Sequence, residues 1–73
     1  MRASEIHFYP NPAHEYIYVE GKENEALRIY DLQGRTIFTA QTSGPLQIPV
    51  HSWPVGMYIL QSGSRTGKVM VVR

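Results

Sequence analysis

The segment Leu27–Phe38, LRIYDLQGRTIF, constrains the fold more than any other part of this sequence. Its first four residues alternate between two faces, and a period of two is typical of a half-buried β-strand. The alternation stops at Asp31–Gly34 and resumes at Arg35. Asp31 can accept a local backbone hydrogen bond at the start of a turn, and Gly34 can supply the positive φ that closes it. The segment therefore predicts a central hairpin.

The other apolar segments are also short, and turn residues separate them. Proline-rich or polar turns are expected at 10–12, 21–25, 42–45, 51–56 and 63–67, and no helical period is present. Trp53 is expected to fold over an open end of the core. The sequence thus predicts an all-β, immunoglobulin-like β-sandwich of about seven short antiparallel strands. These are Ile6–Tyr9, Glu15–Glu20, Leu27–Tyr30, Arg35–Ala40, Leu46–Val50, Met57–Gln61 and Lys68–Arg73.

Composition limits the function classes. A chain of 73 residues has room for one small domain, and without cysteine its core alone must hold it together. A net charge of +1 gives no electrostatic footprint for nucleic acid. No apolar run is long enough to span a bilayer, and the first residues lack the apolar region of a signal peptide. We expect either a cytosolic protein or one piece of a longer chain.

Residues capable of catalysis or metal binding are few. His7, His14 and His51 could in principle hold zinc, but their spacing does not suggest that they converge. Ser52, His51 and Asp31 could be written as a catalytic triad, although a triad is defined by spatial roles and a sandwich this small offers little concavity. We expect no enzyme, no metal or cofactor, and no small-molecule substrate.

Two sets of side chains have both a structural and a binding interpretation. Asp31 and Arg35 can pair across the turn, where an exposed ion pair contributes about 0–1 kcal/mol; alternatively, Arg35 is an exposed recognition handle. Four aromatic residues can either cover the outer faces of the fold or form a platform for sugars. They are Tyr16, Tyr18, Tyr30 and Trp53.

Several phrases occur together in a fixed order: Phe8–Ala13 (FYPNPA), Ile29–Ile37 (IYDLQGRTI), Trp53–Leu60 (WPVGMYIL) and Lys68-Val69 near the end. This order resembles the type A C-terminal sorting domain of proteins exported by the type IX (Por) secretion system of Bacteroidetes, and the resemblance covers Ile6 to Arg73. Trp53 stands where that family usually has leucine, which keeps an apolar side chain there.

The resemblance implies a secretion signal rather than an enzyme. Residues 6–73 would be the sorting domain, and residues 1–5 a linker to the cargo or simply where the piece begins. The domain would direct its cargo from the periplasm through the outer-membrane translocon, with an outer-membrane shuttle protein as a further partner. A sortase-like cysteine protease would then remove it, upstream of Ile6, and anchor the cargo to lipopolysaccharide at the cell surface or release it.

The family motifs map onto particular positions, and in the family the terminal residues, here Val69–Arg73, matter most for export. A closing strand that runs to the last residue would leave its end available at the edge of the molecule, where another chain could pair with it or grip it. Two alternatives remain: an adhesive or carbohydrate-binding module of a surface protein, and a structural spacer, which should be followed by more chain. The candidate sorting residues are Pro10, Asn11, Pro12, Asp31, Gly34, Arg35, Gly56, Tyr58, Lys68, Val69, Met70, Val71, Val72 and Arg73.

Overall fold

The computed structural model describes residues 6–73, and in these residues every regular element is a strand. The elements are β1 (Phe8–Tyr9), β2 (Tyr16–Asp31), β3 (Thr36–Pro49), β4 (Gly56–Ser62) and β5 (Arg65–Val71). All strand pairs are antiparallel. The prediction of an all-β antiparallel fold is therefore confirmed. No helix long and apolar enough to cross a membrane is found in residues 6–73.

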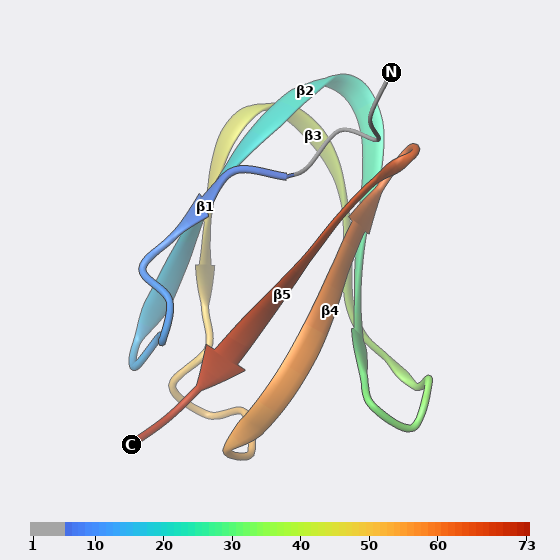
Figure 1. Cartoon of the computed structure of the whole chain (residues 1–73). Coiled ribbons are helices and arrows are strands. Elements are labelled where there is room, and N and C mark those ends of the chain that lie inside the picture. The colour runs from blue at the N-terminus through green and yellow to red at the C-terminus, as the bar shows by residue number, and fades with distance from the viewer. Residues whose placement is uncertain (1–5) are drawn as a thin grey trace.

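The five strands form one curled sheet built around β2. One edge of β2 pairs with β3 along almost its whole length; the other edge pairs with β1 near its start and with β4 near its end. Figure 1 shows β2 and β3 bending over together at the top, while β4 and β5 form a second hairpin. The two halves of the sheet face each other across the core, an arrangement compatible with the predicted sandwich.

Two of the predicted turns are wrong, because the chain stays extended through 21–25 and 42–45 and the seven expected strands become five. Register shifts between Glu20 and Glu25 mark β-bulges, which bend a strand without ending it. Gly21 permits a close approach at the bend: a Cβ there would lie 2.8 Å from the carbonyl oxygen of Gly44. Gly21 and Gly44 therefore lie where the paired strands β2 and β3 bend, rather than in loops between strands.

The β4–β5 connection is also shorter than predicted. Ser62 pairs directly with Arg65, so only two residues form the turn and β5 begins at Arg65 rather than at Lys68. Gly63 has a φ of 61°, the left-handed conformation that two-residue hairpin turns require. The predicted loop at 63–67 is therefore mostly strand.

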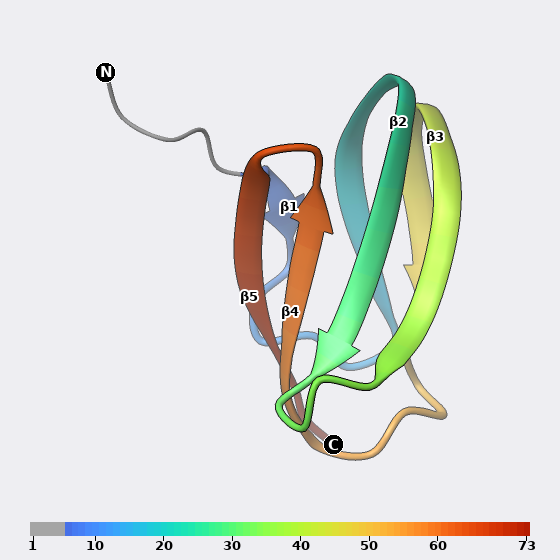
Figure 2. The same cartoon turned by 90° about the vertical axis from the view of Figure 1, so that its right-hand side faces the viewer.

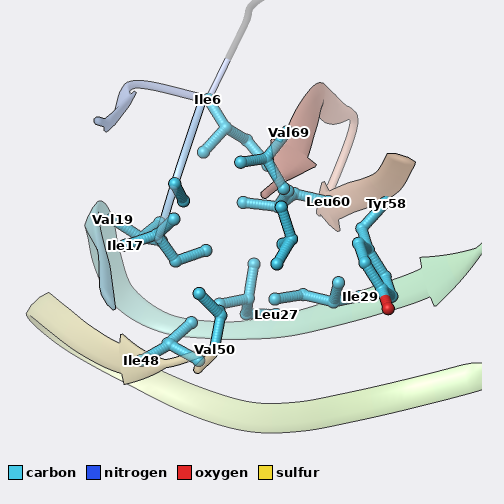
Figure 3. Close-up of a cluster of buried hydrophobic side chains, with 12 residues drawn as sticks. Ile6, Ile17, Val19, Leu27, Ile29, Ile48, Val50, Tyr58, Leu60 and Val69 are labelled. Atoms are coloured by element: carbon cyan, nitrogen blue, oxygen red, sulfur yellow. The ribbon is translucent and has the colours of Figure 1, made fainter. Parts of the chain in front are cut away.

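The core follows the alternation seen in the sequence. Ile17 and Val19 point inward from β2 while Tyr16 and Tyr18 point outward. Figure 3 shows aliphatic side chains from all sides of the curled sheet meeting in its centre. Trp53 packs on one end of this core, as predicted, with its ring 5.0 Å from that of Tyr58. The buried apolar residues are Ile6, Ala13, Ile17, Val19, Leu27, Ile29, Ile48, Val50, Tyr58, Leu60, Val69 and Val71.

Candidate functional site

The structure places the motif residues in two adjoining regions. The first, which we call the turn end, consists of the Asp31–Arg35 turn, the 51–56 loop and the start of β4; the end of β5 lies beside it. Figure 2 shows the β2–β3 turn, the segment before β4 and the C-terminus at the same end of the molecule. The second region is the outer edge of β5, against which Pro10–Ala13 lies.

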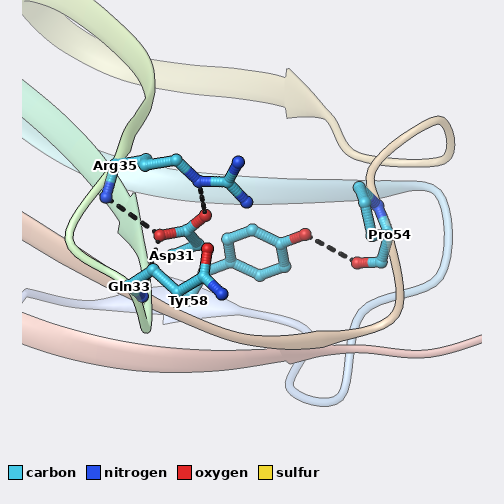
Figure 4. A network of polar contacts seen from close by, with 5 residues as sticks. All are labelled: Asp31, Gln33, Arg35, Pro54 and Tyr58. Atoms are coloured by element: carbon cyan, nitrogen blue, oxygen red, sulfur yellow. Dashed lines mark hydrogen bonds and ion pairs between the residues drawn. The ribbon is translucent and has the colours of Figure 1, made fainter.

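The Asp31–Arg35 turn is organised by one carboxylate. Oδ1 of Asp31 accepts hydrogen bonds from the backbone N–H groups of Gln33 and Arg35, both at 2.9 Å, and Oδ2 accepts from Nε of Arg35 at 2.8 Å (Figure 4). The N–H of Gly34 donates to the Asp31 carbonyl at 3.0 Å, and Gly34 has a φ of 85°. The predicted roles of Asp31 and Gly34 in the turn, and the Asp31–Arg35 ion pair, are all confirmed.

The electrostatics of the turn favour a charged Asp31. Desolvation by itself would raise the pKa of Asp31, but the hydrogen bonds from Arg35 and Gln33 outweigh it and hold the pKa below its usual value. The Arg35 side chain, in contrast, keeps 72% of its surface exposed. The turn therefore presents a guanidinium whose position is fixed from one side and which is open to solvent on the other.

Opposite the turn, the turn end is closed by the buried Tyr58, whose ring packs against that of the partly buried Trp53. Tyr58 is only 3% exposed, and its hydroxyl donates to the carbonyl oxygen of Pro54 at 2.6 Å (Figure 4). Burial raises the pKa of Tyr58, with a further contribution from the charge of Asp31. Gly56 begins β4 and pairs with Val71. These contacts fix the 53–56 segment against the end of β5.

The outer edge of β5 is not open, contrary to the expectation for the closing strand. The side chain of Asn11 donates to the Lys68 carbonyl at 3.2 Å and accepts from the Met70 N–H at 3.0 Å. Ala13 then forms a short parallel bridge with Val71, donating to the Met70 carbonyl and accepting from the Val72 N–H. The Asn11 amide thus takes the place of a backbone peptide group, in a segment where both prolines lack an N–H.

The terminal residues differ in what they expose. Val69 and Val71 are fully buried, whereas Lys68 and Arg73 are exposed and Met70 and Val72 lie between. The Arg73 guanidinium donates to the carbonyls of His51 and Trp53, at 2.9 and 3.0 Å. The last residue is therefore bound to the same loop that carries Trp53.

The other candidate groups do not assemble into a site. Within residues 6–73, no three His, Cys, Asp or Glu side chains gather where a metal ion could bind, His7, His14 and His51 included. Both carboxylate oxygens of Asp31 are engaged in the turn, and no hydrogen bond described by the structure links it to His51 or Ser52.

The four aromatic residues proposed as a sugar platform are divided between three places. Tyr16 and Tyr18 lie exposed on the outer face of β2. Tyr30 bonds Gln61 on the other half of the sheet, and Trp53 packs on the core. The exposed partner of Tyr18 is Tyr9, whose ring is stacked on it at 5.4 Å and which the sequence did not single out.

Sequence reasoning also missed a polar network beside the β4–β5 turn, at the opposite end of the molecule from the turn end. Glu25 accepts from Ser62 Oγ at 2.8 Å and from Arg65 Nη2 at 3.0 Å. These bonds, first that of Ser62 and then that of Arg65, hold the pKa of Glu25 below its usual value. Arg65 is 6% exposed and forms part of the fold. The two partners of Glu25 lie 37 and 40 residues away along the chain, so no local sequence pattern indicates the network.

Comparison with known proteins supports the family that the order of the motifs indicated. A model of the family described as the secretion system C-terminal sorting domain matches residues 7–72. No curated protein and no solved structure gives a significant match. The family match includes the proline segment on the β5 edge, the whole turn end and all of β5. The chain therefore belongs to the family of secretion system C-terminal sorting domains, the sorting signals of type IX secretion.

Proposed function

We propose that residues 6–73 form a non-catalytic signal that, at the C-terminus of a cargo protein, directs the cargo from the periplasm through the type IX translocon to the cell surface. The single observation that carries this proposal is the family match over nearly the whole chain. The proposed partners are the translocon and an outer-membrane shuttle protein. The geometry supports a signal that is read as a folded object, because motifs far apart in the sequence come together at the turn end and along the adjoining edge of β5.

A reporter fusion tests this function directly. A reporter with an N-terminal signal peptide, followed by residues 1–73, should reach the surface or the medium of a host that has the type IX system. The same fusion should stay in the periplasm of an isogenic strain without the translocon, and so should the reporter alone. Export that does not depend on the translocon, or on residues 6–73, would contradict the proposal.

We propose further that a sortase-like protease cuts upstream of Ile6 and anchors the cargo to lipopolysaccharide. Ile6 is 4% exposed, and its N–H donates to the Thr66 carbonyl at 3.3 Å. A protease needs an accessible, extended backbone, so a cut beyond Ile6 would require local unfolding. Mass spectrometry of the exported reporter should find its new C-terminus before residue 6; a cut within 6–73 would show that the boundary is wrong.

We propose that some of the sorting residues contact the export machinery, while the others maintain the fold. Lys68 and Arg35 are exposed and available to a partner, and Arg73 is exposed although its guanidinium is bonded to the 51–56 loop; the proline segment, Gly34, Gly56, Tyr58, Val69 and Val71 maintain the fold. Deleting Val69–Arg73 would remove two core residues, so it cannot separate the two roles. Lys68→Ala should lower export at an unchanged melting temperature, whereas Val69→Ala should lower both. Full export of the Lys68→Ala variant would show that Lys68 does not contact the export machinery.

A second candidate function rests on the outer face of β2. Tyr9, Tyr16 and Tyr18 are 57%, 39% and 40% exposed and lie on one face, which suits the apolar side of a sugar ring. Titration of polysaccharides against the wild-type chain, Tyr16→Ala and Tyr18→Ala distinguishes this candidate. A carbohydrate-binding module should show affinity that the variants lose; a sorting domain should show none.

A further inference from the structure

A groove at the turn end combines the exposed aliphatic surface of this protein with an exposed cation. Within residues 6–73, the large aliphatic side chains classed as exposed are Leu32, Ile37 and Val55, at 69%, 37% and 57%. All three line one groove of about 270 Å³ together with Arg35 and Met57. Exposed aliphatic residues scattered over a surface need no explanation, but a cluster around a groove marks a binding surface.

The guanidinium of Arg35 is set to receive a second carboxylate. Asp31 holds Nε at 2.8 Å, and among residues 6–73 no hydrogen bond is formed by the two Nη groups. Figure 4 shows the two Nη atoms at the tip of the side chain, beyond the Nε atom that Asp31 holds, with no dashed line to either. Two parallel N–H donors on a planar group match a carboxylate in bidentate geometry. The groove therefore offers a fixed donor pair within an apolar rim.

Both walls of the groove are held in place without a ligand. The turn is closed by the hydrogen bond from the Asp31 N–H to the Arg35 carbonyl, at 3.0 Å. The 53–56 wall is held by the Tyr58–Pro54 bond at 2.6 Å and by Arg73 donating to the Trp53 carbonyl. A rigid site loses little conformational entropy on binding, which favours affinity from a small contact area.

We propose that this groove binds an extended peptide segment in which an Asp or Glu side chain lies between apolar residues. The carboxylate pairs with the Nη groups of Arg35, and the apolar neighbours cover Leu32, Ile37 and Val55. A phosphate-bearing glycolipid fits less well, because the other guanidinium near this end, that of Arg73, is already bonded to two carbonyls. That the segment belongs to the export machinery rests on the proposed sorting function.

Peptide titration tests the chemistry without any export. The probe is a blocked pentapeptide with a central aspartate flanked on each side by valine and leucine, and its control has asparagine at the centre. Added to the isotope-labelled chain, the aspartate peptide should shift the methyl signals of Leu32 and Val55 and the Nε–H signal of Arg35. The asparagine peptide should bind at least about tenfold more weakly, since the charge-assisted bidentate contact is lost.

Matched variants assign the effect to the groove. Arg35→Gln and Val55→Asp should each weaken aspartate-peptide binding about tenfold or more. Arg28→Gln removes an exposed arginine from the last third of β2, outside the groove, and should bind as the wild type does. Equal binding of the two peptides, shifts centred on Tyr9 and Tyr18, or displacement of the peptide by equimolar inorganic phosphate would each overturn the proposal.

The export assay separates this inference from the sorting function. If Arg35→Gln and Val55→Asp fold normally and lower reporter export while Arg28→Gln does not, the machinery uses the groove. If both variants are exported at the wild-type level while export still depends on residues 6–73, the groove is not the contact and the sorting function stands. If export does not depend on residues 6–73 at all, the sorting function fails, and the peptide titration alone decides the chemistry of the groove.

Discussion

At the scale of single residues, the Asp31–Arg35 turn shows how much a short pattern can specify. The Asp31 carboxylate accepts three hydrogen bonds, all from residues at most four positions away. Gly34 adopts the positive φ that the turn requires. Both features were predictable, because a turn is built from local chemistry and its residue preferences have local causes.

Gly34→Ala should lower the free energy of unfolding by about 1–2 kcal/mol, because a left-handed conformation is costly for a residue with a Cβ. Nothing lies within 4 Å of the Cβ position at Gly34, so a clash does not contribute. Gly34→Asn is the matched variant and should lose less, since Asn tolerates this conformation. Urea denaturation of the three chains measures both effects; equal losses for Ala and Asn would show that backbone conformation is not the cause.

Acid should destabilise the fold through Asp31 and Glu25. The pKa of each carboxyl is lower in the folded chain than in the unfolded one, so the unfolded chain binds more protons as the pH falls. The stability that the charged forms supply is fully present above about pH 5 and is lost as the pH falls through about 4 and below. Melting temperatures measured from pH 7 to pH 3 should fall in that range.

The double variant Asp31→Asn, Glu25→Gln serves as the control for acid destabilisation. Its melting temperature at pH 7 should be lower than that of the wild type, and its decline below pH 5 should be shallower. An undiminished decline in this variant would assign the acid sensitivity to other groups.

At the scale of elements, the unexpected feature is that both edges of β5 form hydrogen bonds. β4 takes its inner edge, and the proline-rich segment Pro10–Ala13 takes its outer edge through the Asn11 side chain and Ala13. Unpaired strand edges invite pairing with other chains. The proline segment protects this one, because its two prolines have no N–H to present to a further strand.

Asn11→Ala should lower the free energy of unfolding by about 1–2 kcal/mol and speed amide exchange at Met70, because two hydrogen bonds to the β5 edge are lost. Asn11→Asp keeps an acceptor for the Met70 N–H but no donor for the Lys68 carbonyl, so it should keep more of the protection at Met70. Hydrogen exchange followed by NMR reads both positions. Gln47→Ala, at an exposed position on β3, is the control and should leave Met70 unchanged.

Thr42, which is 2% exposed, lies at the bend in the β2–β3 ribbon. Its hydroxyl lies within hydrogen-bond distance of the carbonyl oxygens of Lys22 and Glu25. Thr42→Val should destabilise the fold by about 1–3 kcal/mol, since the buried hydroxyl and its part-buried bonds to two carbonyls are lost. Thr39→Val, at an exposed position on the same strand, should stay within about 0.5 kcal/mol of the wild type. Similar losses for both variants, measured by thermal denaturation, would contradict this role.

At the scale of the whole molecule, hydrogen bonds join the first residues of the described chain, 6–13, to its last strand and the residue after it. Ile6 donates to Thr66, Asn11 bonds Lys68 and Met70, and Ala13 pairs with Val71, so the residues on both sides of β1 are attached to β5. Ile6 and Ala13 also belong to the core. The segment that would join a cargo and the strand expected to be read in export are thus one structural unit.

A chain beginning at Glu15 tests this unit. It lacks Ile6, Phe8 and Ala13 from the core and leaves the β5 edge uncovered, so it should be largely unfolded, as judged by circular dichroism and by the loss of dispersed NMR signals. Supplying residues 6–14 as a separate peptide at high concentration should restore part of the signal dispersion. A stable fold without residues 6–14 would show that this segment is only an accessory.

The sequence alone determined the all-β class, the inward and outward faces of its alternating segments, the Asp31–Arg35 turn and, through the order of its motifs, the family. These follow from periodicity and from turn chemistry, which act over a few residues. Only the tertiary structure decided that Gly21 and Thr42 lie in bends rather than turns, that Asn11 covers the edge of β5, and that Arg35 shares a groove with Val55. These depend on contacts between distant segments, whose partners are chosen by how the whole sheet curls around its core.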